Sequence, residues 1–152
     1  HVIAAKAVAF GEALKPEFRM YTEKIVENAK TMAKEFLKLD YDLVSGGTDT
    51  HVLLIDLTNK SINGKKAENI LGKAGIHLNK NMVPFDTKSP FITSGIRIGT
   101  PAITTRGMGE PEMIQIVNWI DKIINDPDNE KLCSDILLDV NDLCSKFPIY
   151  KH

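Results

Sequence analysis

The sequence lacks a surplus of charge of either sign. Nineteen lysine and arginine residues stand against twenty aspartate and glutamate residues, which gives a formal net charge of −1 over 152 residues. A protein that binds a phosphate backbone or an anionic membrane surface by electrostatic attraction needs a basic surplus. We therefore expect no nucleic acid among the partners of this chain.

Long hydrophobic runs are also missing. No apolar stretch approaches the ~20 residues that span a bilayer. The first six residues have neither the charged head nor the cleavage site of a secretory signal peptide. We expect no membrane partner and a cytoplasmic location.

Cysteine and histidine are scarce. Cys133 and Cys144 lie eleven residues apart in one expected helix, a separation of about 16 Å along the axis, so they cannot form a disulfide with each other there. The four histidines and two cysteines show no short ligand spacing. We expect two buried free thiols and no metal site.

Length and hydrophobic spacing predict one α/β domain. Pro16 begins an amphipathic helix that extends to about residue 39, and further helices are expected at 2–14, 63–75, 111–125 and 132–147. Strands are expected at 51–57, 76–78 and 95–98. A few strands covered on one face by several helices form an α/β two-layer sandwich.

The segment 79–109 has glycine or proline every few residues and no helical period, which is typical of a functional loop. It holds Arg97 and Arg106, two of only three arginines. If 95–98 is a strand, Ile96 and Ile98 face the core and Arg97 faces the opposite side. Arg97 is then a candidate carboxylate clamp, and an internal ion pair is the alternative.

Other candidates for chemistry are weaker. The polar run Asn79-Lys80-Asn81 is as well explained by turn formation as by ligand contact, and Lys80 is expected to be a solvated charge. His51 and His77 have no nucleophile or acid at a suggestive spacing, so both are expected to be structural. The residues alone therefore support an α/β domain with an anion-binding arginine on a glycine- and proline-rich loop.

Several runs resemble one family, the serine hydroxymethyltransferases. They are His1-Val2-Ile3-Ala4-Ala5-Lys6-Ala7-Val8-Ala9, Ser45-Gly46-Gly47-Thr48-Asp49, Asn79-Lys80-Asn81-Met82-Val83-Pro84 and, most specifically, Ser89-Pro90-Phe91-Ile92-Thr93-Ser94-Gly95-Ile96-Arg97-Ile98-Gly99-Thr100-Pro101-Ala102. The resemblance covers essentially the whole chain and places it in the C-terminal part of the family. Enzymes of this family use pyridoxal 5'-phosphate and tetrahydrofolate to interconvert serine and glycine.

The resemblance implies a fold and a division of the chain. It implies the C-terminal small domain of a pyridoxal-phosphate enzyme of the aspartate-aminotransferase type, with a small, mostly antiparallel sheet covered by helices. Residues 1–38 are expected to be leading and connecting helices, and residues 39–152 the small domain. The full-length protein is expected to be a homodimer or a higher oligomer.

The resemblance also implies roles for individual residues. Arg97 matches the arginine that holds the α-carboxylate of serine or glycine, while Asn81, Ser89, Pro90 and Phe91 match positions that contact folate. Arg106 is expected only to support the loop around Arg97.

No residue of this chain matches the lysine that binds the cofactor covalently, so no catalytic residue is assigned. The isolated chain is expected to be an inactive fragment that does not bind pyridoxal 5'-phosphate.

Two alternatives stay open. The chain could be the small domain of another pyridoxal-phosphate enzyme of the same fold, in which the arginine would persist and the folate segment would not. It could also be a free-standing regulatory module that binds a small carboxylate without catalysis.

Overall fold

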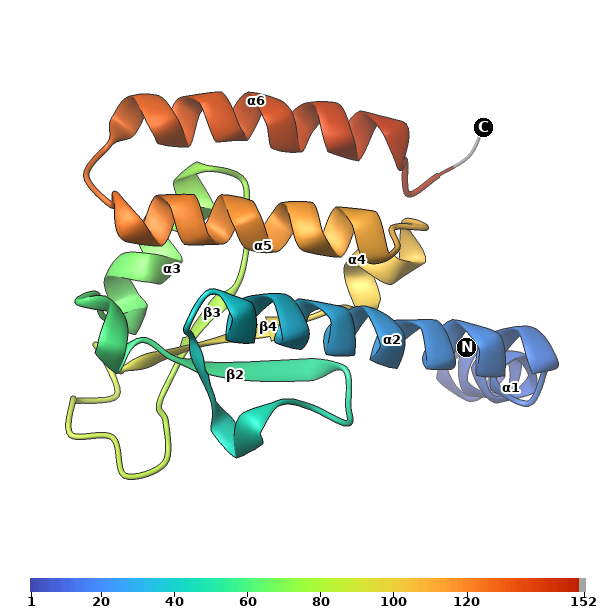
Figure 1. Ribbon diagram of the computed structural model, residues 1–152. Coiled ribbons are helices and arrows are strands. Elements are labelled where there is room, and N and C mark those ends of the chain that lie inside the picture. The colour runs from blue at the N-terminus through green and yellow to red at the C-terminus, as the bar shows by residue number, and fades with distance from the viewer. Residues whose placement is uncertain (151–152) are drawn as a thin grey trace.

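The computed structural model describes residues 1–150 as six α-helices and a four-stranded sheet (Figure 1). The helices are α1 (Val2–Ala13), α2 (Pro16–Lys38), α3 (Gly64–Lys73), α4 (Pro101–Thr105), α5 (Glu110–Asn125) and α6 (Glu130–Lys146). The strands are β1 (Asp42–Leu43), β2 (Val52–Asp56), β3 (Asn79–Asn81) and β4 (Gly95–Gly99). Two short 3-10 turns, Val44–Gly46 and Thr58–Lys60, complete the regular structure.

The sheet is entirely antiparallel and has the order β1-β2-β4-β3. Strand β4 therefore lies inside the sheet, between β2 and the short edge strand β3. Its residues alternate between two faces. Ile96 and Ile98 are buried, whereas Arg97 between them is exposed. In β2, Leu53 and Ile55 are fully buried on the same side.

Helices cover only the face that these aliphatic side chains occupy (Figure 1). The amphipathic period of α2 directs Ile25, Ala29, Met32 and Phe36 inward, and α2 packs against both the sheet and α5. Helix α6 lies over α3 and α5, on the side away from the sheet. The expected fold class, helices over one face of a small antiparallel sheet, is confirmed. Helix α2 contributes to the same core as the sheet and α5. The expected boundary at residue 38, between leading helices and small domain, stays a prediction.

A buried polar network joins α2 to the segment that follows β4. The Asn28 amide nitrogen donates to the Thr104 hydroxyl at 2.9 Å and to the Met108 carbonyl at 3.1 Å. The Thr100 hydroxyl donates to the Ile25 carbonyl at 2.9 Å. Hydrogen bonds of buried groups are expensive to lose, so this network fixes the C-terminal end of β4 against the helix layer.

Two local expectations were wrong. Residues 76–78 are not a strand; pairing with β4 begins only at Asn79. Gly75, at φ 77°, ends the turn after α3, and the next residues lead from the helix to the sheet edge. The segment 79–109 also contains α4, a five-residue helix too short to show a hydrophobic period. His77, expected inside a strand, is exposed.

Helix α1 has no buried residue. It projects from one end of α2 (Figure 1) and exposes four large apolar side chains, namely Val2, Ile3, Val8 and Phe10, and the residue that follows the helix, Leu14, is exposed as well. Exposed apolar clusters of this kind mark surfaces that pack against another chain or domain. In residues 1–150, no helix has the combination of length and hydropathy that a membrane span requires.

The exposure of α1 predicts self-association of the 152-residue chain. Replacing Ile3 and Phe10, which are 85% and 68% exposed, by glutamate should shift the protein toward monomer without lowering its stability. The matched control is Leu138→Glu on α6, a single apolar residue that is 68% exposed and should leave association unchanged. Light scattering that shows a clean wild-type monomer at high concentration would contradict this prediction.

Candidate functional site

The uncovered face of the sheet presents Arg97 at its centre. The register places Leu54 of β2 and Asn79 of β3 directly beside Arg97 on the two neighbouring strands. Within residues 1–150 the guanidinium forms no ion pair and no side-chain hydrogen bond. Among residues 1–150, Arg97 therefore does not form the internal ion pair that was the alternative to a carboxylate clamp. An exposed guanidinium that lacks a protein partner can take a planar carboxylate through two parallel hydrogen bonds.

Asn81 ends β3 on the same face. It pairs with Gly95, two residues before Arg97, so Asn81 and Arg97 are diagonal neighbours, roughly 7–8 Å apart in an antiparallel pair. The Asn81 amide nitrogen donates to the Met82 carbonyl at 2.7 Å, which holds the half-buried side chain in place. The structure thus brings the candidate clamp and the candidate folate residue to one patch of the sheet.

The other candidate folate residues lie on the loop 82–94, which joins β3 to β4. Ser89, Pro90 and Phe91 are all exposed. Phe85 is 100% exposed and Phe91 80% exposed, which is unusual for large apolar side chains in a folded domain. In Figure 1 the loop extends from the sheet to the side opposite the helices. A flat apolar ligand on this side would therefore find aromatic surface as well as polar groups.

One carboxylate organises this loop. Asp86 accepts hydrogen bonds from the backbone N–H groups of Lys88 at 2.9 Å, Ser94 at 2.8 Å and Val83 at 3.3 Å. It also accepts from the Ser94 hydroxyl at 2.7 Å. These donors favour the ionised form, so they lower the pKa of Asp86 from 3.8 to about 2, with the Lys88 N–H as the largest cause.

The far end of the loop is anchored to the N-terminus of α3. The first N–H groups of a helix have no partner within it. Here Gly64 N–H donates to the Thr93 carbonyl at 3.1 Å, and Lys65 N–H donates to the Ile92 carbonyl at 2.9 Å. A Cβ on Gly64 would lie 2.1 Å from the Thr93 hydroxyl oxygen and 2.3 Å from the Gly95 carbonyl oxygen. Only glycine permits this close approach.

The lysine nearest to the site does not belong to it. Lys80 lies between Asn79 and Asn81, and strand alternation directs it to the opposite, helix-covered face. The Lys80 ammonium is 3.6 Å from one carboxylate oxygen of Glu68 on α3. The backbone N–H of Lys80 donates to the other oxygen at 2.9 Å. The expectation of a solvated charge was wrong, because Lys80 is about one-third exposed and paired.

Arg106 acts away from Arg97. Its guanidinium donates to the Cys144 carbonyl at 2.9 Å, near the C-terminal end of α6, where a positive charge is favourable. Arg106 was expected to support the loop around Arg97, but its hydrogen bond instead links the end of α4 to α6.

Cys133 is buried and Cys144 half-buried, and both are free thiols. No cluster of potential metal ligands occurs within residues 1–150.

Sequence reasoning missed Asp86 and Gly64. The signal for Asp86 is weak, since its partners are mostly backbone N–H groups spread from Val83 to Ser94. Asn63 caps α3, and its side chain accepts a hydrogen bond from Lys66 N–H at 2.8 Å. The glycine that follows it gave no sequence cue to its contact with Gly95, 31 positions later.

Gly64→Ala should destabilise the protein because its methyl group would meet backbone atoms that cannot easily move. The free energy of unfolding should fall by about 1–3 kcal/mol in a urea titration. Gly72→Ala in the same helix is the control. Nothing lies within 4 Å of its Cβ, so stability should rise by about 0.5–1 kcal/mol. Equal effects of the two substitutions would show that the loop is not packed against α3 as described.

The lowered pKa of Asp86 predicts that the hydrogen bonds of the loop 82–94 depend on pH. Because its folded pKa lies below its unfolded value, its contribution to stability is complete above about pH 4 and is lost as the pH falls toward about 2. The Asp86 carboxyl carbon, followed by NMR, should titrate near pH 2, and the Lys88 and Ser94 amide resonances should move with it. Asp86→Asn should abolish this movement, whereas Asp142→Asn, at an exposed ion pair on α6, should not. A midpoint near 3.8 would contradict the hydrogen-bond network.

Comparisons with known proteins identify the family of the chain. The family model for serine hydroxymethyltransferase matches residues 1–120. The chain is 56% identical to serine hydroxymethyltransferase of Dichelobacter nodosus (strain VCS1703A) over 150 residues, which are 99% of this chain and 36% of that protein. It is 54% identical to serine hydroxymethyltransferase of Coxiella burnetii (strain CbuG_Q212) over 151 residues, with the same two shares.

The chain thus spans about a third of the length of the curated relatives that it matches. Identity at this level over nearly the whole chain leaves no ambiguity about ancestry. The chain belongs to the serine hydroxymethyltransferase family.

Proposed function

We propose that this chain forms the substrate-binding small domain of an enzyme that transfers the hydroxymethyl group of serine to tetrahydrofolate. The observation that carries the proposal is the exposed Arg97 guanidinium, which has no protein partner in residues 1–150 and lies on the uncovered face of the sheet. Family membership supplies the reaction class. The exposure of Arg97 on the uncovered face supports a contact with the amino-acid carboxylate there.

Arg97 would fix the orientation of the substrate. Two parallel hydrogen bonds to the carboxylate remove its rotational freedom and so select which bond at Cα is presented for cleavage. Pyridoxal 5'-phosphate, when bound by the full-length protein, supplies an electron sink for the bond that breaks. The contribution of this chain is the carboxylate contact, with Leu54 as the neighbour of Arg97 on β2.

Asn81, Ser89, Pro90 and Phe91 would bind the folate. An amide offers both a donor and an acceptor, which suits the edge of a pteridine ring. Exposed Phe91 offers an apolar surface for the flat ring system. The hydrogen bonds of Asp86 and the contact of the loop with α3 hold these groups in one conformation before the ligand arrives, which reduces the entropy lost on binding.

The remaining two-thirds of the full-length protein would carry the cofactor lysine and most of the cofactor site. On this proposal the isolated chain is inactive. We also propose that the full-length protein is a cytoplasmic homodimer or higher oligomer. The two free thiols are in keeping with a reducing compartment, and the exposed apolar side chains of α1 are in keeping with burial in a larger assembly.

Arg97→Lys in the full-length protein tests the proposal. Lysine keeps the charge but loses the paired hydrogen bonds, so kcat/KM for serine should fall by at least about 100-fold. Because Arg97 is exposed and unpaired, the thermal stability of the variant should not change. Arg19→Lys is the control, since Arg19 lies on an exposed part of α2 and pairs only with Glu23. Activity within a few-fold of wild type for Arg97→Lys would overturn the assignment.

A further inference from the structure

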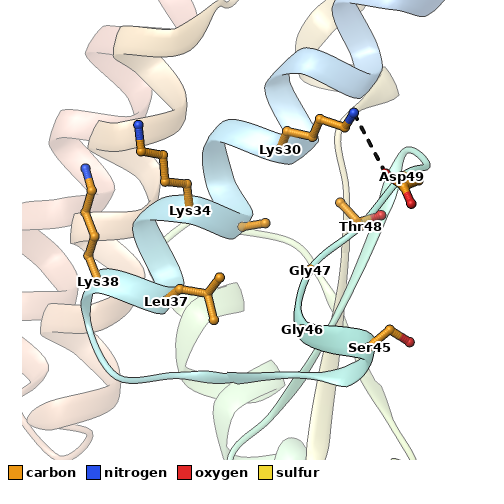
Figure 2. Close-up of a pocket in the computed structure, with 10 residues that line it drawn as sticks. Lys30, Lys34, Leu37, Lys38, Ser45, Gly46, Gly47, Thr48 and Asp49 are labelled. Atoms are coloured by element: carbon orange, nitrogen blue, oxygen red, sulfur yellow. Dashed lines mark ion pairs between the residues drawn. The ribbon is translucent and has the colours of Figure 1, made fainter.

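The cleft between the C-terminal half of α2 and the turn at residues 45–49 is not a built binding site. It has a volume of about 750 Å³, but Figure 2 shows Lys34 and Lys38 pointing away from the turn. Lys30 is already paired with Asp49, at 3.8 Å. The cleft is therefore a hollow in the surface, and we assign it no ligand.

The start of α3 holds a chemically more specific feature. Asn63 is the only asparagine of the chain that is followed by glycine. In such a pair the backbone nitrogen of the glycine can attack the side-chain carbonyl carbon of the asparagine, because glycine has no Cβ that hinders the approach and its backbone rotates freely. No other side chain and no cofactor is needed, so the pair can react wherever its backbone can move.

The reaction of this pair is a deamidation. A bond forms between the Gly64 nitrogen and the Asn63 side-chain carbonyl carbon, and the bond from that carbon to the amide nitrogen breaks. The amide nitrogen leaves as ammonia and takes the Gly64 amide proton with it. Water then opens the five-membered ring at one of its two carbonyl carbons, which gives aspartate or isoaspartate at position 63.

The folded structure engages both groups that must react. The Asn63 side-chain oxygen accepts from Lys66 N–H at 2.8 Å, as the cap of α3. The Gly64 N–H donates to the Thr93 carbonyl at 3.1 Å. Ring closure requires the Gly64 nitrogen to give up its proton and to approach the Asn63 side chain. The hydrogen bond to Thr93 must therefore break, and the cap must turn away from Lys66.

The loop 82–94 also encloses the backbone of this pair. Gly64 is buried, and a Cβ on it would lie 2.1 Å from the Thr93 hydroxyl oxygen and 2.3 Å from the Gly95 carbonyl oxygen. The next residue, Lys65, donates its N–H to the Ile92 carbonyl at 2.9 Å. A backbone enclosed this closely cannot rotate while these contacts persist.

We infer that Asn63 is a site of spontaneous deamidation whose rate is set by the opening of the loop 82–94. While the loop lies against α3, its contacts with Gly64 block ring closure. When the loop opens, the pair reacts as it does in an unfolded chain. Local openings cost anything from almost no free energy up to that of global unfolding, so the rate reports how firmly the loop is held. The modification does not depend on the proposed function.

The two products should affect the loop differently. Aspartate caps a helix about as well as asparagine, and its charge is favourable at the N-terminus of α3. Isoaspartate instead routes the main chain through the side chain, which adds one carbon atom before the Gly64 nitrogen. Gly64 lies where an additional atom would meet Thr93 and Gly95. Isoaspartate should therefore detach the loop from α3, and with it the surface that we propose for folate.

The test follows Asn63 by peptide mass spectrometry while the 152-residue protein is incubated at mildly alkaline pH, with and without a denaturing concentration of urea. Deamidation of Asn63 should be at least roughly tenfold slower in the folded protein than in urea. Asn59 is the internal reference. It is exposed and precedes lysine, so it should react slowly under both conditions.

Variants of the loop test whether the loop sets the rate. Asp86→Ala removes the acceptor of the hydrogen bonds from Lys88 and Ser94, so the folded-state rate should rise at least roughly threefold while the rate in urea stays the same. Ser94→Ala removes only the hydroxyl bond to Asp86 and should cause a smaller rise. Asp142→Ala, at an exposed ion pair on α6, is the matched control and should change neither rate.

Three results would overturn the inference. They are no deamidation of Asn63 even in urea, equal rates in the folded and unfolded protein, and an unchanged folded-state rate in both loop variants, since the protection would then come from α3 alone. Circular dichroism shows whether each variant is folded, and Ser94→Ala keeps the test decisive should Asp86→Ala not fold. None of these measurements involves serine, folate or cofactor, so they stand apart from the proposed function.

The isoaspartate product, separated by chromatography, tests the effect on the loop. Its Lys65 N–H should exchange with deuterium at least roughly tenfold faster than in the Asn63→Asp variant, because the bond to the Ile92 carbonyl is lost. Equal exchange in the two proteins would show that the loop stays bound to α3 after the modification.

Discussion

The structure depends on the alternation of side chains along β4. Ile96 and Ile98 are buried beneath the helices, and β2 and β3 fix the strand from both sides through their backbone hydrogen bonds. With period two, Arg97 between them must face the uncovered side. A slip of one residue would bury a guanidinium in an aliphatic core and expose the two isoleucines. The burial of the two isoleucines and the outward position of Arg97, the candidate carboxylate clamp, thus follow from the same strand register.

The same strand ties the arginine to the loop that precedes it. Asn81 pairs with Gly95, while Asp86 holds Ser94 and the N-terminus of α3 holds Ile92 and Thr93. The loop that carries the candidate folate residues is therefore bonded both to β4 and to α3. Exposed aromatic side chains on a loop that is this firmly bonded are consistent with a preformed ligand surface. Thr100 and Asn28 fix the other end of β4 to α2.

Much of this was predictable from the sequence where hydrophobic period was strong. The long helices, β2, β4 and the outward direction of Arg97 all follow from the spacing of aliphatic residues. The edge strand β3 was misplaced because its pairing uses backbone groups, and its polar side chains carry no apolar pattern. Helix α4 is too short to show a period. The role of Asp86 could not be read because its partners are backbone N–H groups, and the pairing of Lys80 with Glu68 depends on how β3 and α3 meet in space.

The most direct test of the central claim is a crystal structure of the full-length protein with glycine and tetrahydrofolate bound. We predict that both nitrogens of one edge of the Arg97 guanidinium lie about 2.7–2.9 Å from the glycine carboxylate. Asn81 and the segment 89–91 should contact the folate. A structure in which Arg97 instead pairs with an aspartate or glutamate of the protein, while the glycine carboxylate is held elsewhere, would contradict this account.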